Sequence, residues 1–526
     1  MSIVRPDEEI VPRNRAARRA AGHRARKIGA LSSSVVLAGA AGAAVMGVMS
    51  TTPAGALTTF EVNQTTDAGD GTCDATCTLR DAVENATADA DTSEIVFASN
   101  VTGSIVLTSG HLEVDTGGDL RVTGPGASVV TVDGNANGNI FYSDGGFGDY
   151  TLSISGLTLT NADEGNDGGA IEFYDDGGGT QSLVLTNMVI TGNTAGDDGG
   201  GIQFYTDGDL TIINSTITGN TAGNDGGGIQ FYGGNDLTIT NSTISGNTAS
   251  DDGGGLYFYG SGDLTITNST ITGNTGASGE GGGIGFDRGN DLTITNSTIS
   301  GNTAGTDGGG IKFDRGDVLT ITNSTISGNT SGRKGGGLYL DGDGVMTITN
   351  STIAGNTAAD TGGGIAVRGG GITLLQSTIS GNTAGGFGDG LYLRSPNSDP
   401  VGLIGSIISA NGEFDIDTNS TISVTSTNSL LGTNGAGITI IDAGGTITST
   451  DPGLAALADN GGPTQTMALL LSSPAIDTGP DPVPSFTGNE FDQRGAGYPR
   501  VVNGRVDIGA YEFAPEVVVP ELRFTG

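Results

Sequence analysis

The central part of the sequence repeats one unit about every 27 residues. The stretch DDGGGLYFYGSGDLTITNSTITGNT at 251–275 returns almost letter for letter as EGGGIGFDRGNDLTITNSTISGNT at 280–303. A Gly-Asn-Thr triplet marks the period, with its asparagine in steps of 26 to 28 residues at Asn193, Asn220, Asn247, Asn274, Asn302, Asn329, Asn356 and Asn382. A fixed period of this size indicates a solenoid in which each repeat forms one coil.

Each repeat contains three short segments in which apolar residues alternate with others, for example 256–258, 264–266 and 269–271. A period of two is typical of strands, and glycine or asparagine turns separate the segments. No unit holds a long stretch with helical periodicity, so helical repeat classes are excluded. The sequence therefore predicts an all-β fold, a parallel β-helix with three strands and about 27 residues per coil.

Stacked coils turn each repeat position into a column of like residues. Because strands in neighbouring coils lie about 4.8 Å apart, apolar positions form continuous inward stacks, one of which contains Phe204, Phe231, Phe258, Phe286 and Phe313. One coil alone cannot bury its apolar slice, which explains why the unit repeats. We expect the asparagine column to form a hydrogen-bonded ladder at a turn, with left-handed backbone angles.

A basic segment precedes an uncharged one near the N-terminus. Arginine and lysine gather at 13–27, an Ala/Gly/Val-rich run follows at 28–50, and Ala54-Gly55-Ala56 offers a small-residue cleavage site. This pattern is typical of an export signal. The alternative is an uncleaved membrane anchor, because the run could just span a bilayer. We expect export and no membrane span in the mature chain.

The chain is strongly acidic. It has 21 Lys and Arg against 58 Asp and Glu, a net charge of −37, and without residues 1–56 the balance is 13 against 55, a net charge of −42. Such a surface repels nucleic acid and anionic lipid, so we expect no nucleic-acid partner. We expect a secreted or cell-surface protein that is monomeric.

The repeats resemble the bacterial right-handed parallel β-helix proteins of the pectin-lyase-like superfamily, and motifs at both ends narrow the resemblance. CTLRDA at 77–82 is similar to the Cys-Ser-Leu-Arg-Glu-Ala motif of a family of exported β-helix proteins. Four segments near the other end resemble the choice-of-anchor C-terminal domain of bacterial surface proteins. They are ADNGGPTQT at 458–466, SPAID at 473–477, DQRG at 492–495 and DIGAYE at 507–512. The resemblance implies a right-handed coil and an exported surface protein of largely unassigned biochemistry.

These signals divide the chain into six parts. We expect an export signal at 1–56, an N-terminal cap and first irregular coils at 57–150, regular β-helix repeats at 151–412, degenerate coils at 413–455, a choice-of-anchor-like module at 456–513 and a tail at 514–526. Open strand edges need covering, so we expect caps at both ends, with an amphipathic helical segment at 79–86 over the first coil. The tail resembles a Leu-Pro-x-Thr-Gly sorting motif but has Arg523 in place of proline, which leaves the mode of attachment open.

Cys73 and Cys77 are the only cysteines of the chain. In an exported chain such a pair favours one disulfide. A metal site would lack nearby ligands, and redox catalysis would favour the shorter Cys-x-x-Cys spacing.

Two outward columns on the first strand of each repeat form the candidate binding face. The later column changes from tyrosine to aspartate to arginine and contains Tyr174, Tyr205, Tyr232, Tyr259, Asp287, Asp314, Asp341, Arg368 and Arg394. The earlier column, two residues before it, contains Glu172, Gln203, Gln230, Tyr257, Gly285, Lys312, Tyr339, Ala366 and Tyr392. Seven basic residues lie between 288 and 394, a local exception on an acidic chain.

Three functions fit this face. In the favoured one, adhesion or glycan and matrix binding, tyrosines stack on sugar rings and charged groups bind hydroxyls or uronates, through Tyr232, Tyr257, Tyr259, Asp287, Arg288, Lys312, Asp314, Arg315, Tyr339 and Arg368. In the second, a polysaccharide lyase or glycoside hydrolase uses Asp287, Asp314, Asp341, Lys312, Arg288 and Arg315, with stacked carboxylates about 5 or 10 Å apart. In the third, the face is solvated, its tyrosines pack on one another as ladders, its arginines offset neighbouring aspartates, and the protein is a structural spacer. The residues of the face alone favour this third interpretation, because polar outward positions are expected on any such strand.

Residue types restrict the enzyme interpretation. The mature chain keeps one histidine, His111, without a nucleophile motif near it, and it has no HExxH motif. These absences argue against triad chemistry, and an enzyme would depend on carboxylates, arginine, lysine or calcium. The Asp-His and Arg-Pro elements of pectate-lyase sites are not found, so we lean against an enzyme.

A second acidic column precedes the glycine triplets and contains Asp198, Asp225, Asp252, Glu280 and Asp307. Stacked carboxylates repel one another, so calcium is a candidate ligand between them, with plain hydration as the alternative. The column lacks the Gly-Gly-x-Gly-x-Asp spacing of calcium β-rolls. We expect no other cofactor.

Overall fold

The computed structural model describes residues 57–514, except 90, 146–147, 176–178, 395–400, 487 and 503. The predicted export signal at 1–56 and the tail from 515 onward lie outside the described residues. The described residues belong to one compact unit, Gly55–Gly526.

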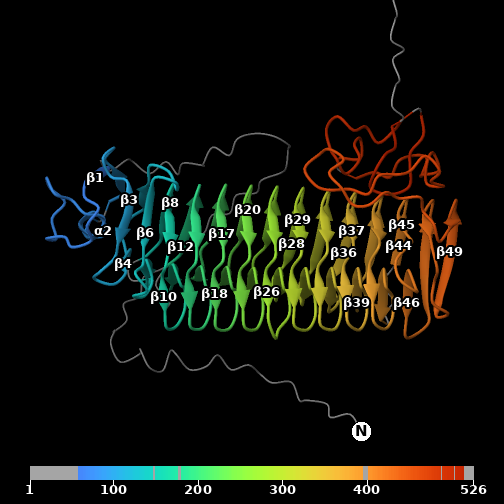
Figure 1. Cartoon of the computed structure of the whole chain (residues 1–526), viewed down its shortest axis with the longest axis horizontal. Coiled ribbons are helices and arrows are strands. Elements are labelled where there is room, and N and C mark those ends of the chain that lie inside the picture. The colour runs from blue at the N-terminus through green and yellow to red at the C-terminus, as the bar shows by residue number, and fades with distance from the viewer. Residues whose placement is uncertain are drawn as a thin grey trace, which may run out of the picture. The chain divides into compact units, whose positions relative to one another are not determined.

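Each central coil supplies one strand to each of four parallel sheets. In one coil these strands are β23 (Leu256–Gly260), β24 (Leu264–Thr267), β25 (Thr270–Thr272) and β26 (Thr275–Gly276). The three predicted strands are joined by a fourth, two residues long, which follows the Gly-Asn-Thr turn. Successive coils stack along one axis (Figure 1). The predicted parallel β-helix is confirmed.

We name the four sheets A to D. In the described residues, sheet A has 15 strands, from β1 (Thr58–Val62) to β49 (Ile438–Gly444), and sheet B has 14, from β3 (Gly103–Val106) to β50 (Ile447–Thr448). Sheet D has nine, from β10 (Asp163–Glu164) to β42 (Thr383–Ala384). Sheet C carries the candidate face on 12 strands, which are β4 (Leu112–Glu113), β7 (Phe141–Ser143), β11 (Ile171–Tyr174), β15 (Ile202–Tyr205), β19 (Ile229–Gly233), β23, β27 (Ile284–Asp287), β31 (Ile311–Asp314), β35 (Leu338–Asp341), β39 (Ile365–Arg368), β43 (Leu391–Arg394) and β46 (Ile416–Thr418).

The inward columns form the core as predicted. Phe258 of β23 pairs in register with Phe286 of β27, and both side chains are buried. Their rings stack with centroids 4.9 Å apart, and Phe231 lies 4.8 Å away on the other side. The spacing of the coils is therefore also the spacing of the stacked rings, so phenylalanine at this position packs equally well in successive coils.

The asparagine ladder is confirmed, but its predicted backbone conformation is wrong. The side-chain amide of Asn274 donates to Oδ1 of Asn302 at 3.0 Å and to the carbonyl of Ile244 at 3.0 Å. The left-handed angles belong instead to the preceding Gly273, with φ of 65°, and to a second asparagine column represented by Asn268, with φ of 50°. The two left-handed residues lie in different turns. Asn268 lies between β24 and β25, and Gly273 lies between β25 and β26, where the ladder residue Asn274 follows it and makes the hydrogen bonds.

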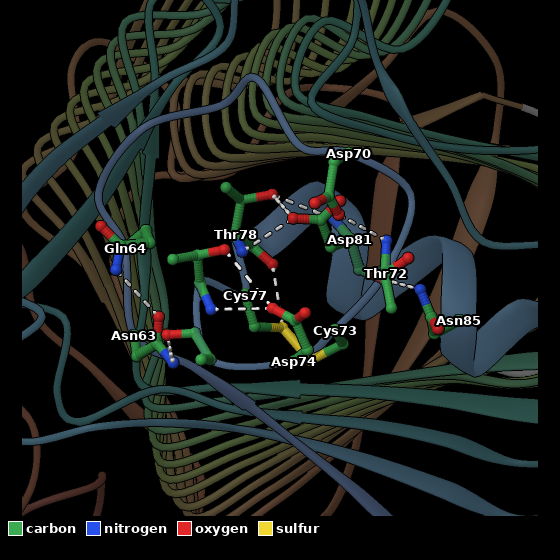
Figure 2. Close-up of a disulfide and its surroundings, with 12 residues drawn as sticks. Asn63, Gln64, Asp70, Thr72, Cys73, Asp74, Cys77, Thr78, Asp81 and Asn85 are labelled. Carbon is green, nitrogen blue, oxygen red and sulfur yellow. Dashed lines mark hydrogen bonds between the residues drawn. A yellow bond between two sulfur atoms is a disulfide. The ribbon is translucent and has the colours of Figure 1, made fainter.

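Helix α2 (Leu79–Thr87) covers the first coil as predicted, packing against β1 and β2 (Ser93–Phe97). Thr78 and Asp81 close its N-terminus with a capping box. The predicted Cys73–Cys77 disulfide is present immediately before the helix (Figure 2). Among the described residues, no helix combines the length and apolar composition that a bilayer crossing needs.

The C-terminal segment after β50 is irregular and lies along the flank of sheet B, where Figure 1 shows it beside β37 (Thr352–Ala354) and β45 (Ile407–Ile408). Gln493 donates from Nε2 to Oγ1 of Thr325 at 2.9 Å and accepts at Oε1 from Oγ1 of Thr352 at 2.6 Å. Apolar residues of the segment also pack on outward isoleucine and leucine of the last coils. A cap over the end was expected, whereas the inward Ile438 and Ile440 of β49, the last strand of sheet A, are only partly buried.

Candidate functional site

The earlier outward column of sheet C is covered rather than open. Lys312 is only 4% exposed and Tyr339 only 1%, although both alternate away from the core. Tyr257 is half-buried, and burial raises its pKa above the ordinary tyrosine value. The expectation that Tyr257, Lys312 and Tyr339 stand on an open face is therefore corrected.

The glycine triplets explain this burial. The first glycine of each triplet has a left-handed conformation, for example Gly253 with φ of 62°, and folds the chain back over the start of the following strand. A Cβ on Gly253 would lie 2.6 Å from Cβ of Tyr257, and one on Gly335 would lie 2.7 Å from Cβ of Tyr339. The turn thus lies directly on the earlier column, and only glycine fits there.

The later column contains a row of stacked tyrosines. Ring centroids are 5.0 Å apart for Tyr174 and Tyr205, 4.6 Å for Tyr205 and Tyr232, and 4.8 Å for Tyr232 and Tyr259. The guanidinium of Arg288 lies 5.0 Å over the ring of Tyr259. Because the ring faces contact one another, the row offers hydroxyls and ring edges, which corrects the expectation that these rings stack on sugars.

The next coils bring the predicted charged residues together. Arg315 spans two coils, with Nη2 2.9 Å from Oδ2 of Asp287 and Nε 3.2 Å from Oδ2 of Asp314. Arg368 lies 3.2 Å from Oδ2 of Asp341. The ammonium of Lys312 is 2.8 Å from Glu280. The sequence placed these groups on one face, and the solvated-face interpretation expected arginine to offset neighbouring aspartate, as Arg315 and Arg368 do.

Burial and ion pairing shift the pKa values of these charged groups in opposite directions. Burial raises the pKa of Asp287 and of Asp314 above the ordinary aspartate value, although Arg315 and Lys312 oppose the shift. Although burial alone would lower the pKa of Lys312, the carboxylates of Glu280 and Asp314 raise it overall. Lys312 and Arg315 therefore stay charged at neutral pH, which makes them unsuited to act as bases.

An open depression of about 480 Å³ lies on the arginine end of this face. It is lined by Asp314, Arg315, Asp341, Gly342, Asp343, Arg368, Gly369 and Arg394. The side chains of Arg315 and Arg368 are about half exposed, at 51% and 53%. Four of the predicted residues thus share one concavity, whereas Tyr232, Tyr257 and Tyr259 do not line it.

Sequence reasoning missed the N-terminal end of the same face. Strand β4 pairs Glu113 with Tyr142 of β7, which places Asp115 and Asp144 at the head of the later column. Burial, together with the neighbouring Asp144, raises the pKa of Asp115 to about 7. A second depression of about 440 Å³ lies beside Asp115, between β4 and α2. The period is longer in these first coils, so the column could not be extended by counting.

The second acidic column acts as a hydrogen-bonded ladder. Oδ1 of Asp225 accepts from the backbone N–H of Asp252 at 2.9 Å, and Oδ1 of Asp252 accepts from that of Glu280 at 2.7 Å. Asp198 and Asp307 make the same bond to the residue one coil on. In the part of the chain that the structure describes, no three His, Cys, Asp or Glu side chains are grouped to hold a metal ion.

This ladder is expected to make stability depend on pH. Burial, with the charge of Asp252 second, raises the pKa of Asp225 to about 8, and burial raises those of Asp198 and Asp252 to about 6. The folded state then binds protons more tightly than the unfolded state, so stability is highest below about pH 4 and falls as pH rises toward 8. Thermal melts at pH 5 and pH 8 should show the higher midpoint at pH 5. The Asp225→Asn variant should show a smaller difference, and a midpoint that rises with pH would contradict this.

Comparisons with known proteins give a family match and similar solved structures. The family model described as right handed beta helix region matches residues 169–334 and 309–453. A search of curated proteins gave no significant match. Among solved structures, the chain is similar to pectate lyase Pel9A, with 13% identity, 88% of this chain and 98% of that chain covered, and a TM-score of 0.36.

The family match covers the regular repeats that build sheet C and the coils after them. The structure gives those repeats the stacked parallel strands and the buried columns described above. Because the matched segment spans 169–453, more than half of the 526 residues, the chain belongs to the right-handed β-helix family.

Proposed function

We propose that this chain is an exported cell-surface or extracellular protein that binds glycans along sheet C and does not cleave them. The observation that carries the proposal is the open depression in which Arg315, Arg368 and Arg394 lie beside Asp314 and Asp341. Arginine and carboxylate groups together can bind the hydroxyls of a sugar, and exposed arginine can also bind a uronate. The basic and hydrophobic pattern of residues 1–56 supports export.

The row of tyrosines extends this binding face. Tyr174, Tyr205, Tyr232 and Tyr259 are half-buried and lead in register to Asp287 of the next coil. Their hydroxyls donate and accept hydrogen bonds at intervals of about 4.8 Å, the spacing of coils. A repeated spacing of polar groups suits a polymer better than a small ligand.

A glycoside hydrolase is the second candidate function, because Asp287 and Asp314 are adjacent carboxyls with raised pKa values. Both are held by Arg315, which opposes their use as acid and base. A lyase is less well supported, because the pKa values of Lys312 and Arg315 are raised, so neither supplies a neutral base.

Incubation with a panel of polysaccharides distinguishes these functions. The proposal expects retention of at least one glycan, with no unsaturated products and no new reducing ends. Cleavage that Asp314→Asn abolishes would establish the enzyme instead. No retention of any glycan would support a structural spacer.

Calcium bound along the ladder of Asp198, Asp225, Asp252, Glu280 and Asp307 stays a separate proposal. It is supported by the raised pKa values, which an adjacent cation would lower by favouring the charged carboxylates. Melts with and without a chelator at pH 8 test it. An unchanged midpoint would exclude a structural calcium ion.

A further inference from the structure

The later column of sheet C is complementary to its own reverse. From the N-terminal end it runs Asp115, Asp144, Tyr174, Tyr205, Tyr232, Tyr259, Asp287, Asp314, Asp341, Arg368 and Arg394, one residue per coil. Carboxylates lie at one end and arginines at the other, with Tyr259 in the middle. When the column is placed opposite a reversed copy of itself, each of the first two aspartates faces an arginine. Each of the other three aspartates faces a tyrosine.

A simple rotation brings these partners together. If a second copy is turned about a two-fold axis that is parallel to the strands and passes in front of Tyr259, the two faces meet with their coils in opposite order. Asp115 then lies opposite Arg394, and Asp144 lies opposite Arg368. The tyrosines Tyr174, Tyr205 and Tyr232 lie opposite Asp341, Asp314 and Asp287, so that each hydroxyl can donate to a carboxylate.

We propose that sheet C is an interface with a second copy of this chain, paired antiparallel about Tyr259. This goes beyond the proposed glycan binding and departs from the monomer that the sequence suggested. Charge complementarity carries it, because every contact in the column joins opposite charges or a hydroxyl and an acceptor, except for Tyr259 with itself. Parallel pairing would place aspartate on aspartate and arginine on arginine. If each copy slides by one coil toward its own arginine end, Asp144 lies opposite Asp341. The opposite slide leaves Asp115 without a partner and keeps only one of the two kinds of ion pair.

The required side chains are accessible. Asp144 and Arg394 are exposed, Arg368 is 53% exposed, and the tyrosines are half-buried. Ten coil spacings make the contact about 48 Å long. It is narrow, and the net charge of −37 opposes association, so we expect a reversible dimer rather than a permanent one.

Exchanging the charges of Asp144 and Arg368 tests the pairing. Sedimentation velocity over a concentration series measures the fractions of monomer and dimer. Asp144→Arg and Arg368→Asp should each shift the protein toward monomer, because each places like charges together twice in a symmetric dimer. The double variant should restore dimer. Asp209→Arg, immediately before strand β16 (Leu210–Ile213) of sheet A, and Arg121→Asp, on sheet A, make matched charge changes at exposed positions. They should have little effect on dimer formation. A protein that is monomeric at every concentration, or a double variant that stays monomeric, would overturn the proposal.

Cross-linking locates the axis independently. The two natural cysteines are joined to each other, so an added cysteine is the only free thiol. Tyr259→Cys should form a covalent dimer on mild oxidation, whereas Tyr174→Cys should not, because only Tyr259 meets itself. Equal cross-linking of both would overturn the antiparallel arrangement. The dimer would cover Arg368 and Arg394, which also line the proposed glycan site. Glycan retention is therefore measured at a protein concentration at which sedimentation shows monomer, so that either proposal can fail without the other.

Discussion

Replacing Asn274 by alanine is expected to lower the free energy of unfolding by about 3 kcal/mol or more, because three buried groups lose partners that each contribute about 1–3 kcal/mol. The carbonyl of Ile244 loses its donor, and the backbone N–H and side-chain amide of Asn247 lose Oδ1 of Asn274. No water reaches this column, since the ladder side chains are fully buried. Chemical denaturation of the variant measures the loss.

Asn290→Ala is the matched control. Asn290 is exposed, so the same chemical change there should alter stability by no more than about 0.5 kcal/mol. Equal losses for the two variants would show that the ladder does not stabilise the coils.

Phe258→Ala is expected to lower stability by about 3–5 kcal/mol, because it removes a fully buried ring and leaves a cavity. The ring lies between Phe231 and Phe286, with centroids 4.8 Å and 4.9 Å away, and neither neighbour can fill the space without leaving its own coil. The same denaturation experiment measures this effect.

The next residue along the chain provides the comparison. Tyr259 stacks on the outer side of the same strand and is half-buried, so Tyr259→Ala should cost only about 1–2 kcal/mol. If Tyr259→Ala lowered the free energy of unfolding more than Phe258→Ala does, the assignment of Phe258 to the core and Tyr259 to the outer face would be wrong.

The fold could be predicted from the sequence because the same alternation and nearly the same repeat length occur in every central coil. Alternation with period two placed Phe258 inside and Tyr259 outside, and the repeat length stacked each on its equivalent in the next coil. The asparagine ladder followed from the same periodicity. Its left-handed residues did not, because asparagine occurs in two turns of each repeat and suits such angles in either. Only the structure shows that Asn268 adopts them and Asn274 does not.

The candidate site was less predictable, because it depends on how turns and side chains lie outside the strands. Strand alternation placed Lys312 and Tyr339 outward, but the glycine turns cover them. Alternation also could not decide whether the tyrosine rings would stack on sugars or on one another, or which aspartates Arg315 would pair with. The Asp115 and Asp144 end was hidden because the first coils vary in length.

These corrections narrow the binding face. What stays accessible is a row of tyrosine hydroxyls that leads to a concavity with arginine and aspartate. Lys312 acts within the protein by neutralising Glu280 and the aspartates around it. A ligand is therefore expected to contact Arg315, Arg368 and Arg394 rather than the covered column.

Titration of the retained glycan into the wild-type protein and into the Arg368→Ala, Arg394→Ala double variant tests glycan binding at sheet C most directly. Loss of two arginine contacts should weaken binding by about a hundredfold or more, since hydrogen bonds to charged groups contribute about 1.5–3 kcal/mol each. Arg121→Ala, which removes an exposed arginine from sheet A, should bind as the wild type does. Binding without products, lost in the double variant alone, is the expected result. Unchanged affinity in the double variant would contradict the proposed site.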